Sequence, residues 1–599
     1  MNDSTNRSGS LFFACDHFGF SFSDFDNYLP GKAYRLAVRK GNFSTSKGVL
    51  SLQDVKLLPQ DSLWQLGANS YISVETPMVY ATGLSHLPQK LLQHLDAASL
   101  HVESPDIRML KKDGSLLHLT LHDLEIGKIA WDSLHFSVGS IDLSEPVIRY
   151  QAGNSPDTIK VKKKSPLIIS NDIYEAVNRF TPDLSLGKLA VSNAVWNGDT
   201  ASFYLEGLHI NAKDRTFGLK TVRFDTRDLA FPLDNGSYTL KIGKVHLDNT
   251  DLSLENIRLV SAWPKMEFAY RQPKHQDWFD VKVGKLGLSG IDLPAYFSDQ
   301  TVRIRNVQID DAELQNFKNQ QIAVPRHIVP MIYSGLQKAP VKVAVDSLAV
   351  NNFTVVYEEL SKKGTEPGKL FFTEMNGQFS GFTNIVSRPD QYIRLDANGK
   401  LMGKGYFTAT WMLPVDSLND RFLLDAHLTD FDLTALNELI TPLAFAKVES
   451  GRLTDFTFST EASSKGATVG MLFLYRDLKA EIMKEKNGEV TDNKFLSRLA
   501  NLVLKHDNPD HPERGTHRPR YSRLSIERDP YHSTFNYLWQ ILRPALTESV
   551  GVSKKTQDMA KEVTGFFAKV KNFFHPKKKK RQEDKVSGQN APDGEPNPD

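Results

Sequence analysis

The chain has 599 residues and an almost balanced charge, with 73 Lys and Arg against 71 Asp and Glu. This balance gives no general attraction for nucleic acid, so nucleic acid is not expected as a partner. The single cysteine, Cys15, excludes an internal disulfide. No continuous apolar run reaches about 18 residues, so the sequence predicts no membrane-spanning helix.

The length exceeds one ordinary compact domain, yet no sharp linker appears before the far C-terminus. Residues 1–30 lack periodicity and are expected to be irregular. From residue 31 to about 380, short strands follow one another, and segments 116–121 and 238–242 alternate cleanly between apolar and polar side chains. Alternation with a period of two places one face against apolar material and the other in water. The sequence therefore predicts a mainly β fold, an elongated and curved antiparallel sheet built of repeats.

One short phrase recurs along this β region. Residues 283–288 read Val-Gly-Lys-Leu-Gly-Leu, and close copies occupy 242–247 and 186–191, with looser copies at 138–143 and 345–350. Self-similarity at intervals of roughly 40–60 residues indicates a stacked or laterally extended repeat protein.

The apolar residues of this phrase are spaced two, three and two apart, as in Val281, Val283, Leu286 and Leu288. A strand cannot keep one face apolar across a spacing of three without a local irregularity, and glycine is favoured at such points. We therefore predict bulges or sharp bends at Gly139, Gly187, Gly243, Gly284 and Asp346. Repeated bends curl a sheet. The alternative is that one strand ends at each of these residues and another begins.

Three short helices with three-to-four apolar spacing are predicted at 87–95, 171–180 and 327–336, where they would cap an open sheet. Residues 381–482 form a distinct β-rich segment that includes a helix at 433–439.

Residues 483–575 are predicted to form amphipathic helices, and residues 576–599 a basic and then disordered tail. A phenylalanine stripe followed by a run of cations is typical of a helix that lies in an anionic membrane surface. The predicted membrane-contacting residues are Phe535, Trp539, Leu542, Phe566, Phe567, Phe573, Phe574, Lys577, Lys578, Lys579, Lys580 and Arg581. Two alternatives stay open: a helix packed on its own domain, or a basic segment for nuclear localisation or nucleic acid.

No spacing typical of a catalytic, cofactor or metal site occurs. There is no glycine-rich phosphate loop and no nucleophile elbow. His511 and His517 flank Glu513, but their spacing is not that of a zinc-binding helix. The sequence therefore predicts a protein without enzymatic activity, cofactor or metal.

Several segments resemble the C-terminal region of AsmA-like proteins of Gram-negative envelopes, especially the large Bacteroidetes-type members related to bridge-like lipid transporters. The matching segments are 403–407 (Gly-Lys-Gly-Tyr-Phe), 430–433 (Asp-Phe-Asp-Leu), 436–437, 449–453, 470–478, 528–530 and 535–539. The resemblance implies a long β groove with an apolar inside, anchored at the inner membrane, that moves phospholipid toward the outer membrane or supports envelope assembly. Family members typically begin with a transmembrane helix that this sequence lacks, so either its start is truncated or misassigned, or its C-terminal helices make the membrane contact.

We therefore expect a non-enzymatic protein of the cell envelope, periplasmic and membrane-associated, with a phospholipid or other acyl lipid, the membrane surface and envelope proteins as partners. The expected groove-lining residues are Leu189, Val191, Val245, Leu247, Leu286, Leu288, Leu348 and Val350. The alternative is a structural or adhesion-like β scaffold in which these side chains form an ordinary closed core.

Overall fold

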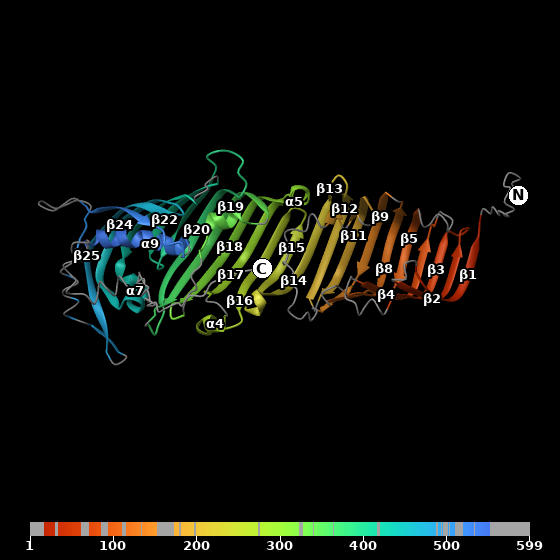
Figure 1. Cartoon of the computed structure of the whole chain (residues 1–599), viewed down its shortest axis with the longest axis horizontal. Coiled ribbons are helices and arrows are strands. Elements are labelled where there is room, and N and C mark those ends of the chain that lie inside the picture. The colour runs from red at the N-terminus through yellow and green to blue at the C-terminus, as the bar shows by residue number, and fades with distance from the viewer. Residues whose placement is uncertain are drawn as a thin grey trace, which may run out of the picture.

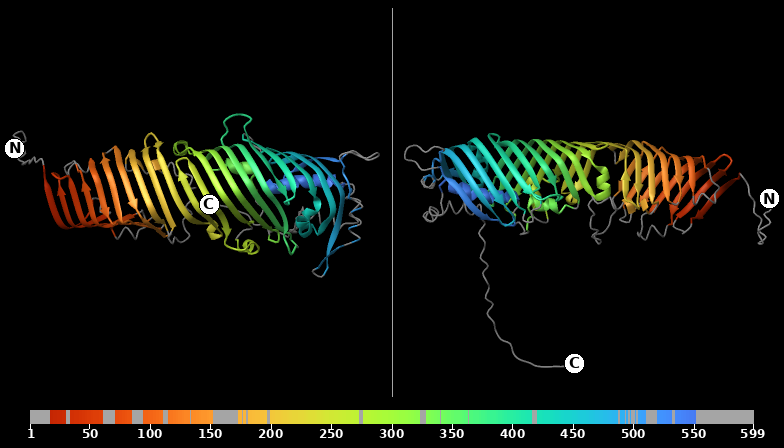
Figure 2. Two further views of the ribbon diagram at one scale, coloured as in Figure 1. Left: turned by 180° about the vertical axis from the view of Figure 1, so that it is seen from behind. Right: turned by 90° about the horizontal axis from the view of Figure 1, so that it is seen from above.

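The structure is a computed structural model in which one large sheet forms an elongated, curved body, with the described strands in nearly sequential order along its length (Figures 1 and 2). It describes residues 17–29, 34–60, 71–84, 94–110, 115–132, 134–151, 173–175, 177–178, 181–196, 199–272, 276–322, 328–339, 341–362, 364–415, 420–486, 489–492, 494, 497, 501, 504–509, 519–531 and 534–551. Nearly all of the described elements are strands of this sheet, which confirms the predicted mainly β fold. The sheet is mixed but mostly antiparallel.

The N-terminal part of the sheet contains short strands, several of which are halves of one longer bent strand. They are β1 (Gly19–Tyr28), β2 (Tyr34–Ser44), β3 (Val49–Pro59), β4 (Tyr71–Thr82), β5 (Leu95–Glu103), β6 (Asp106–Leu110), β7 (Leu116–Thr120), β8 (Asp123–Trp131), β9 (His135–Ser144) and β10 (Val147–Gln151). Pro105 separates β5 from β6 and Pro146 separates β9 from β10. Proline lacks the N–H that a continuous ladder needs, so pairing breaks at these points.

The strands of the middle and C-terminal parts, most of them longer, continue the same sheet. They are β11 (Asp183–Trp196), β12 (Asp199–Asn211), β13 (Thr216–Gly218), β14 (Thr221–Leu233), β15 (Tyr238–Asp248), β16 (Asp251–Ser261), β17 (Trp278–Ile291), β18 (Thr301–Asn319), β19 (Lys342–Leu360), β20 (Gly368–Thr383), β21 (Tyr392–Leu401), β22 (Gly405–Pro414), β23 (Phe422–Asp432), β24 (Ala446–Ala462), β25 (Gly466–Lys486) and β27 (Tyr521–Glu527). Strand β26 (Glu489–Asp492) forms a hairpin with the end of β25. Strand β20 spans residue 380, so the sheet continues into the segment 381–482 without a break.

The first strand lies in a segment predicted to be irregular. In β1, Phe20 and Phe22 alternate with serines, and these rings pair across the ladder with Phe43 and Gly41 of β2. Gly41 leaves room for the Phe22 ring, because a Cβ at residue 41 would lie 2.2 Å from it. The alternation was visible in the sequence, but the surrounding Gly, Asn and Asp obscured it.

Three parallel strand pairs, at two joins in the sheet, interrupt the predicted antiparallel order. Strand β11 pairs in parallel with β9 and β10, and β19 pairs in parallel with β18 along its whole length. A parallel pair requires a long return connection. Residues described as helical within 173–178 lie in the first connection, and α6 (Ile332–Gln337) lies in the second. Two of the three predicted helices therefore belong to crossovers, while the third, at 87–95, falls almost entirely outside the described residues.

Other short helices lie beside the strands. The 3-10 helix η2 (Leu433–Leu436) and α7 (Asn437–Ala444) confirm the helix predicted at 433–439, and α9 (Thr534–Ser549) confirms the helix predicted around Phe535 and Leu542. The helices α4 (Lys265–Arg271) and α5 (Leu293–Asp299) and the 3-10 helix η1 (Asp234–Gly236) were not predicted. With seven residues or fewer, each is too short to show a clear period.

The glycines of the repeated phrase lie inside continuous strands, which excludes the alternative that strands end there. Next to Gly284, β17 pairs Val283 with Ala312 and Lys285 with Asp310, so one residue on each strand drops out of the ladder while the register is kept. No extra residue is inserted, in contrast to the predicted bulge. The skipped partner, Asp311, has a left-handed backbone with φ of 54°.

This pattern of a skipped pair repeats from strand to strand. Gly243 lies between the left-handed residues Asp228 and Asn256, and Gly284 lies between Asn256 and Asp311. A Cβ on Gly243 or Gly284 would lie 3.0 Å from the Cβ of Asn256 or Asp311, respectively. Glycine is therefore favoured by the close approach of the neighbouring strand, while the short polar residues adopt the left-handed conformation.

The remaining predicted bends belong to two other lines across the sheet. Gly139 and Gly187 are skipped together between β9 and β11, and a Cβ on Gly187 would lie 2.4 Å from the Gly139 carbonyl oxygen. Asp346 is skipped opposite both Arg305 and Gly381. Lines of bends thus cross many strands and allow the whole sheet to curve.

Candidate functional site

A row of apolar side chains crosses the sheet, one residue from each successive long or split strand and each directly paired with the next. We call it the central row: Phe22, Gly41, Leu52, Val79, Val102, Leu124, Leu143, Val191, Phe203, Phe224, Leu247, Leu252, Leu288, Val307, Leu348, Phe379, Leu395, Trp411 and Leu424. Gly41 and Val102 are buried, and the other residues of the row are only partly buried. The row is therefore a continuous apolar track that the described protein atoms leave partly accessible.

Two parallel flanking rows widen this track. The first flanking row contains Ile126, Ile141, Leu189, Leu205 and Val222. The second flanking row contains Val245, Leu254, Leu286, Ile309 and Val350. Direct cross-strand partners and residues two apart on a strand lie on the same face of a sheet, so the three rows form one apolar surface.

The eight residues predicted to line a groove lie together in these rows. Four of them, Val191, Leu247, Leu288 and Leu348, are in the central row, and the remaining four, Leu189, Val245, Leu286 and Val350, are in the flanking rows. Val245 is 7% exposed, whereas the other seven are partly accessible. The prediction missed the row's extension to Phe22 at one end and Leu424 at the other. The alternation within each strand signals these residues, but their alignment depends on the register.

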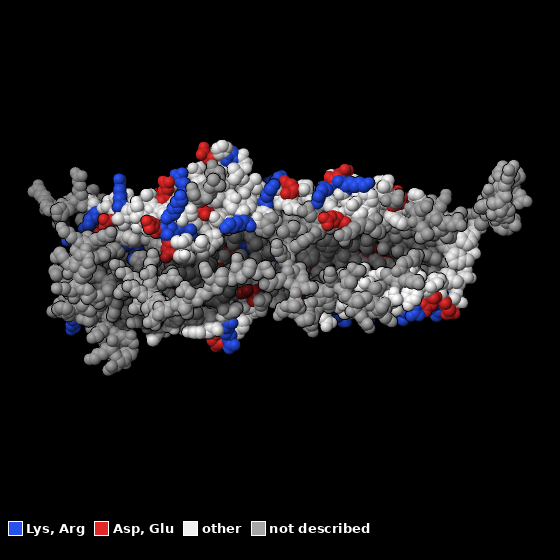
Figure 3. All heavy atoms as spheres, viewed as in Figure 1, with Lys and Arg blue, Asp and Glu red and all other residues white. Residues whose placement is uncertain are grey.

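The opposite face of the same strands carries charged side chains that pair across the ladder. Lys188 Nζ lies 2.6 Å from Asp142 Oδ1, Lys244 Nζ lies 3.4 Å from Glu255 Oε1, and Lys282 Nζ lies 3.3 Å from Glu313 Oε2. In the view of Figure 3, the Lys, Arg, Asp and Glu side chains of the described residues lie mostly along the two long rims, and a hollow is visible between the rims toward the N-terminal end. We call the apolar face the inner face and the charged face the outer face.

The inner face is covered by protein at the C-terminal end of the sheet. Tyr537, Ile541 and Ala545 of α9 are fully buried in a cluster with Phe458 and Met471. Burial raises the pKa of Tyr537 to about 12 and lowers that of Arg543 in the same helix to about 10. In Figure 1, α9 lies within the curve of the strands from β20 to β25.

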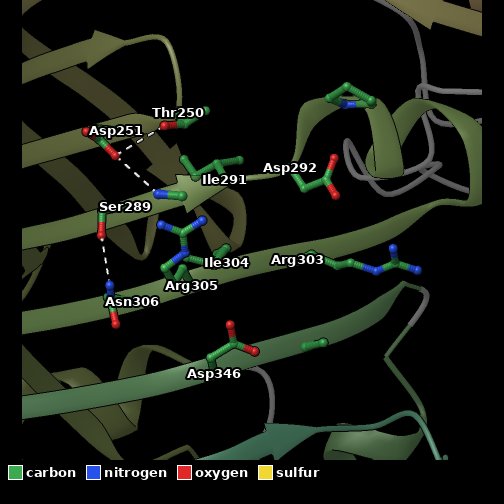
Figure 4. A pocket seen from close by; sticks show the side chains of 13 residues that line it. Thr250, Asp251, Ser289, Ile291, Asp292, Arg303, Ile304, Arg305, Asn306 and Asp346 are labelled. Carbon is green, nitrogen blue, oxygen red and sulfur yellow. Dashed lines mark hydrogen bonds between the residues drawn. The ribbon is translucent and has the colours of Figure 1, made fainter.

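A polar pocket of about 700 Å³ lies where the line of bends through Asp346 crosses β17 to β19. Figure 4 shows Arg305 and Asp346 on neighbouring strands at this point, and Asn306 Nδ2 donates to Ser289 Oγ at 3.3 Å. The lining mixes the carboxylates of Asp251, Asp292 and Asp346 with the guanidinium groups of Arg303 and Arg305. Such a mixture favours neither an anionic nor a cationic ligand. We therefore interpret the pocket as a consequence of the bend in the strands and not as a binding site.

The predicted membrane-contacting residues fall in two groups. In α9, Leu542 packs against the core cluster and Trp539 is 38% exposed, while nothing is described of the Phe535 side chain. Phe566, Phe567, Phe573, Phe574 and the basic run Lys577–Arg581 lie outside the described residues. Contact with a membrane therefore stays a prediction for both groups.

Within the described part of the chain, no group of three or more His, Cys, Asp or Glu residues could hold a metal ion. The helices in that part are all too short or too polar to cross a membrane. Comparison with family models and with curated proteins finds no match for the chain.

Proposed function

We propose that the protein binds phospholipid through its acyl chains along the central row and conducts it along the groove without enzymatic chemistry. The observation that carries this proposal is the continuous, partly accessible apolar track across successive strands from β1 to β23. Exposed apolar surfaces of this extent are typical of interaction sites. A flexible chain of methylenes matches a long track that offers no specific polar partner.

The energetics of this binding follow from contact area alone. Burying one methylene is worth about 0.8 kcal/mol, so a chain lying along several strands is held without hydrogen bonds. Each strand presents a similar apolar environment, so movement from one strand to the next exchanges equivalent contacts. The polar head group would stay at a rim, where the charged side chains lie.

The resemblance to AsmA-like envelope proteins supports the same proposal and adds a setting for it. In that setting the protein is membrane-associated in the periplasm and supports outer-membrane assembly or integrity. The curved β groove that the resemblance implies agrees with the curved sheet and its apolar inner face.

The decisive measurement is native mass spectrometry with lipid extraction after gentle purification. We expect co-purified phospholipid, and at least a tenfold loss of it in the Leu288→Ser/Leu348→Ser double variant, because each change removes about 1.5–3 kcal/mol of apolar contact. Ser253→Thr/Gly287→Ser, on the outer face of neighbouring strands, is the matched control and should retain the lipid. Absence of lipid from the unaltered protein would refute the groove function.

The predicted terminal helix needs its own test. Phe566, Phe567, Phe573 and Phe574 are changed together to Ser, and binding to anionic liposomes is measured by flotation. We expect the bound fraction to fall severalfold, because the apolar side of the helix is lost while the basic run remains. Unchanged flotation would contradict the membrane assignment of these residues.

The alternative, a structural scaffold with a closed core, is favoured at one end only. The cluster around Tyr475, Phe458 and α9 is a buried core of the ordinary kind. A scaffold throughout the chain would contain no bound lipid in any part of the groove.

A further inference from the structure

We infer that α9 ends the apolar track, so that a bound acyl chain occupies the inner face from β1 to about β20 and stops there. This inference rests on the proposed function and specifies which part of the sheet binds lipid. The central row itself does not stop at β20, because it continues through Trp411 to Leu424. Beyond β20, however, its surface is taken by the protein's own side chains.

Beyond β20, α9 and the cluster to which it belongs pack against the row. Trp411 and Leu424 both pack against the buried cluster that contains Ile541 and Ala545. Those two α9 residues are 0% exposed. The cluster to which the apolar side of the helix belongs therefore takes the space that an acyl chain would need beside Trp411 and Leu424.

The crossover between β18 and β19 covers the row just before α9. Tyr333 of α6 is 3% exposed and forms a cluster with Ile393 and Val415, and Phe379 of the central row packs against that cluster. The Val329 N–H donates to the Pro530 carbonyl at 2.9 Å, and Arg528 Nη2 donates to the Val329 carbonyl at 2.7 Å. The crossover is thus tied to the segment that leads into α9, and the two form one cover.

The last turn of α9 is held by hydrogen bonds to β27 and to the residue that precedes it. Ser522 Oγ donates to the Ala545 carbonyl at 3.0 Å, and Arg520 Nε donates to the Ser549 carbonyl at 2.8 Å. The hydroxyl groups of Ser522 and Ser549 lie 3.1 Å apart. The bond from Arg520 satisfies the Ser549 carbonyl, which is one of the last four of the helix and has no partner within it. A helix held in this way is a permanent end to the track.

The test maps the lipid by site-specific photo-crosslinking in the full-length protein. Leu288, Leu348 and Leu424 are replaced singly by p-benzoylphenylalanine, and the exposed Lys285 on the outer face serves as the matched control. The probe is radiolabelled phosphatidylglycerol in phosphatidylcholine vesicles. We expect lipid adducts at 288 and 348 at least tenfold above the control. At 424 we expect only background lipid labelling, with a crosslink to an α9 peptide in its place.

A lipid adduct at 424 as strong as that at 348, or no crosslink from 424 to α9, would overturn the inference. Failure of the proposed function looks different: 288 and 348 would give no lipid adduct, while 424 would still crosslink to α9. In that outcome α9 would still cover the C-terminal end of the inner face, but no lipid would bind along the rest of that face.

A disulfide lock tests the same inference without a bulky group in the core. Ser522→Cys and Ser549→Cys are combined with Cys15→Ser, which removes the single native cysteine. Oxidation should leave the lipid adducts at 288 and 348 within twofold of the reduced protein. Loss of those adducts on oxidation, with recovery on reduction, would contradict a permanent end, because the helix would then have to leave for lipid to enter.

Discussion

The two ends of the sheet use the same alternating strands but differ in what meets the apolar face. From β20 onward, the inner face packs against α7, α9 and the second crossover, and Phe431, Leu453 and Tyr475 are at most 1% exposed. Along β11 to β19, the side chains of the central row stay partly accessible. Alternation in the sequence therefore predicts that a strand has an apolar face, but it does not predict what packs against that face.

The difference predicts unequal stability costs for the same substitution at the two ends. Phe431→Ala should lower the free energy of unfolding by about 3–5 kcal/mol, because it leaves a cavity in a closed core. Phe224→Ala in the central row should cost only about 1 kcal/mol, because that ring is already partly in water. Urea unfolding followed by tryptophan fluorescence measures both. Equal losses would show that the groove is as closed as the C-terminal end.

The bends offer a second comparison, between two glycines of β17. Gly284→Val should destabilise the protein by about 1–3 kcal/mol, because the new Cβ would lie 3.0 Å from the Asp311 Cβ and 3.3 Å from the Asp310 carbonyl oxygen. Gly287→Val is the matched control, since a Cβ there meets nothing within 4 Å, and its effect should stay within about 0.5 kcal/mol. Thermal unfolding compares the two variants, and a harmless Gly284→Val would remove the packing reason for this glycine.

A smaller effect concerns the outer face, where Glu313 accepts hydrogen bonds from Gln315 and from Lys282. The hydrogen bond from Gln315, and to a smaller extent the one from Lys282, lowers the pKa of the Glu313 carboxyl below its usual range. A lowered folded-state pKa stabilises the protein above the unfolded pKa, and this contribution disappears as the pH falls through the folded pKa. Glu313→Gln should therefore reduce stability slightly at pH 7. The difference should begin to shrink as the pH falls to the usual glutamate pKa of about 4.3 and should vanish only below the lowered folded pKa.

Unfolding midpoints of both proteins between pH 7 and pH 3 test this dependence. A difference that is constant with pH would assign the loss to the changed hydrogen-bond geometry and not to the charge. For a variant substituted at a central-row residue, the difference in unfolding midpoint from the unaltered protein should not depend on pH, because no titratable group lies in that row.

Much of this architecture was predictable from local pattern. The two-three-two spacing around Gly243 and Gly284 correctly indicated bends within strands, because a change of phase is recorded in the sequence itself. The left-handed partner residues Asp228, Asn256 and Asp311 were not predicted, because they face the glycines only through the register. The parallel pairing of β18 with β19 was also missed, since a long connection in the sequence does not reveal in which direction it returns.

The eight residues proposed for the groove were found for the same local reason, since each belongs to an alternating segment. What the sequence could not show is which of them are accessible. Val245 is buried, while Leu247, two residues further on the same strand, is not. Accessibility depends on where helices such as α9 pack. The apolar side of α9, seen in the sequence alone, is compatible with packing on a membrane or on its own sheet.

The two joins between parallel strands also bear on how the chain reaches its native state. They divide the strands into three antiparallel sections, β1 to β10, β11 to β18 and β19 to β27, within which most partners are close in sequence. Contacts between sequence neighbours close short loops and form quickly, whereas the two joins close long ones. We therefore expect the sections to fold as separate cooperative units, with the joins at β11 and β19 formed last. Until then, the edge strands at each join would expose unpaired backbone groups to other chains.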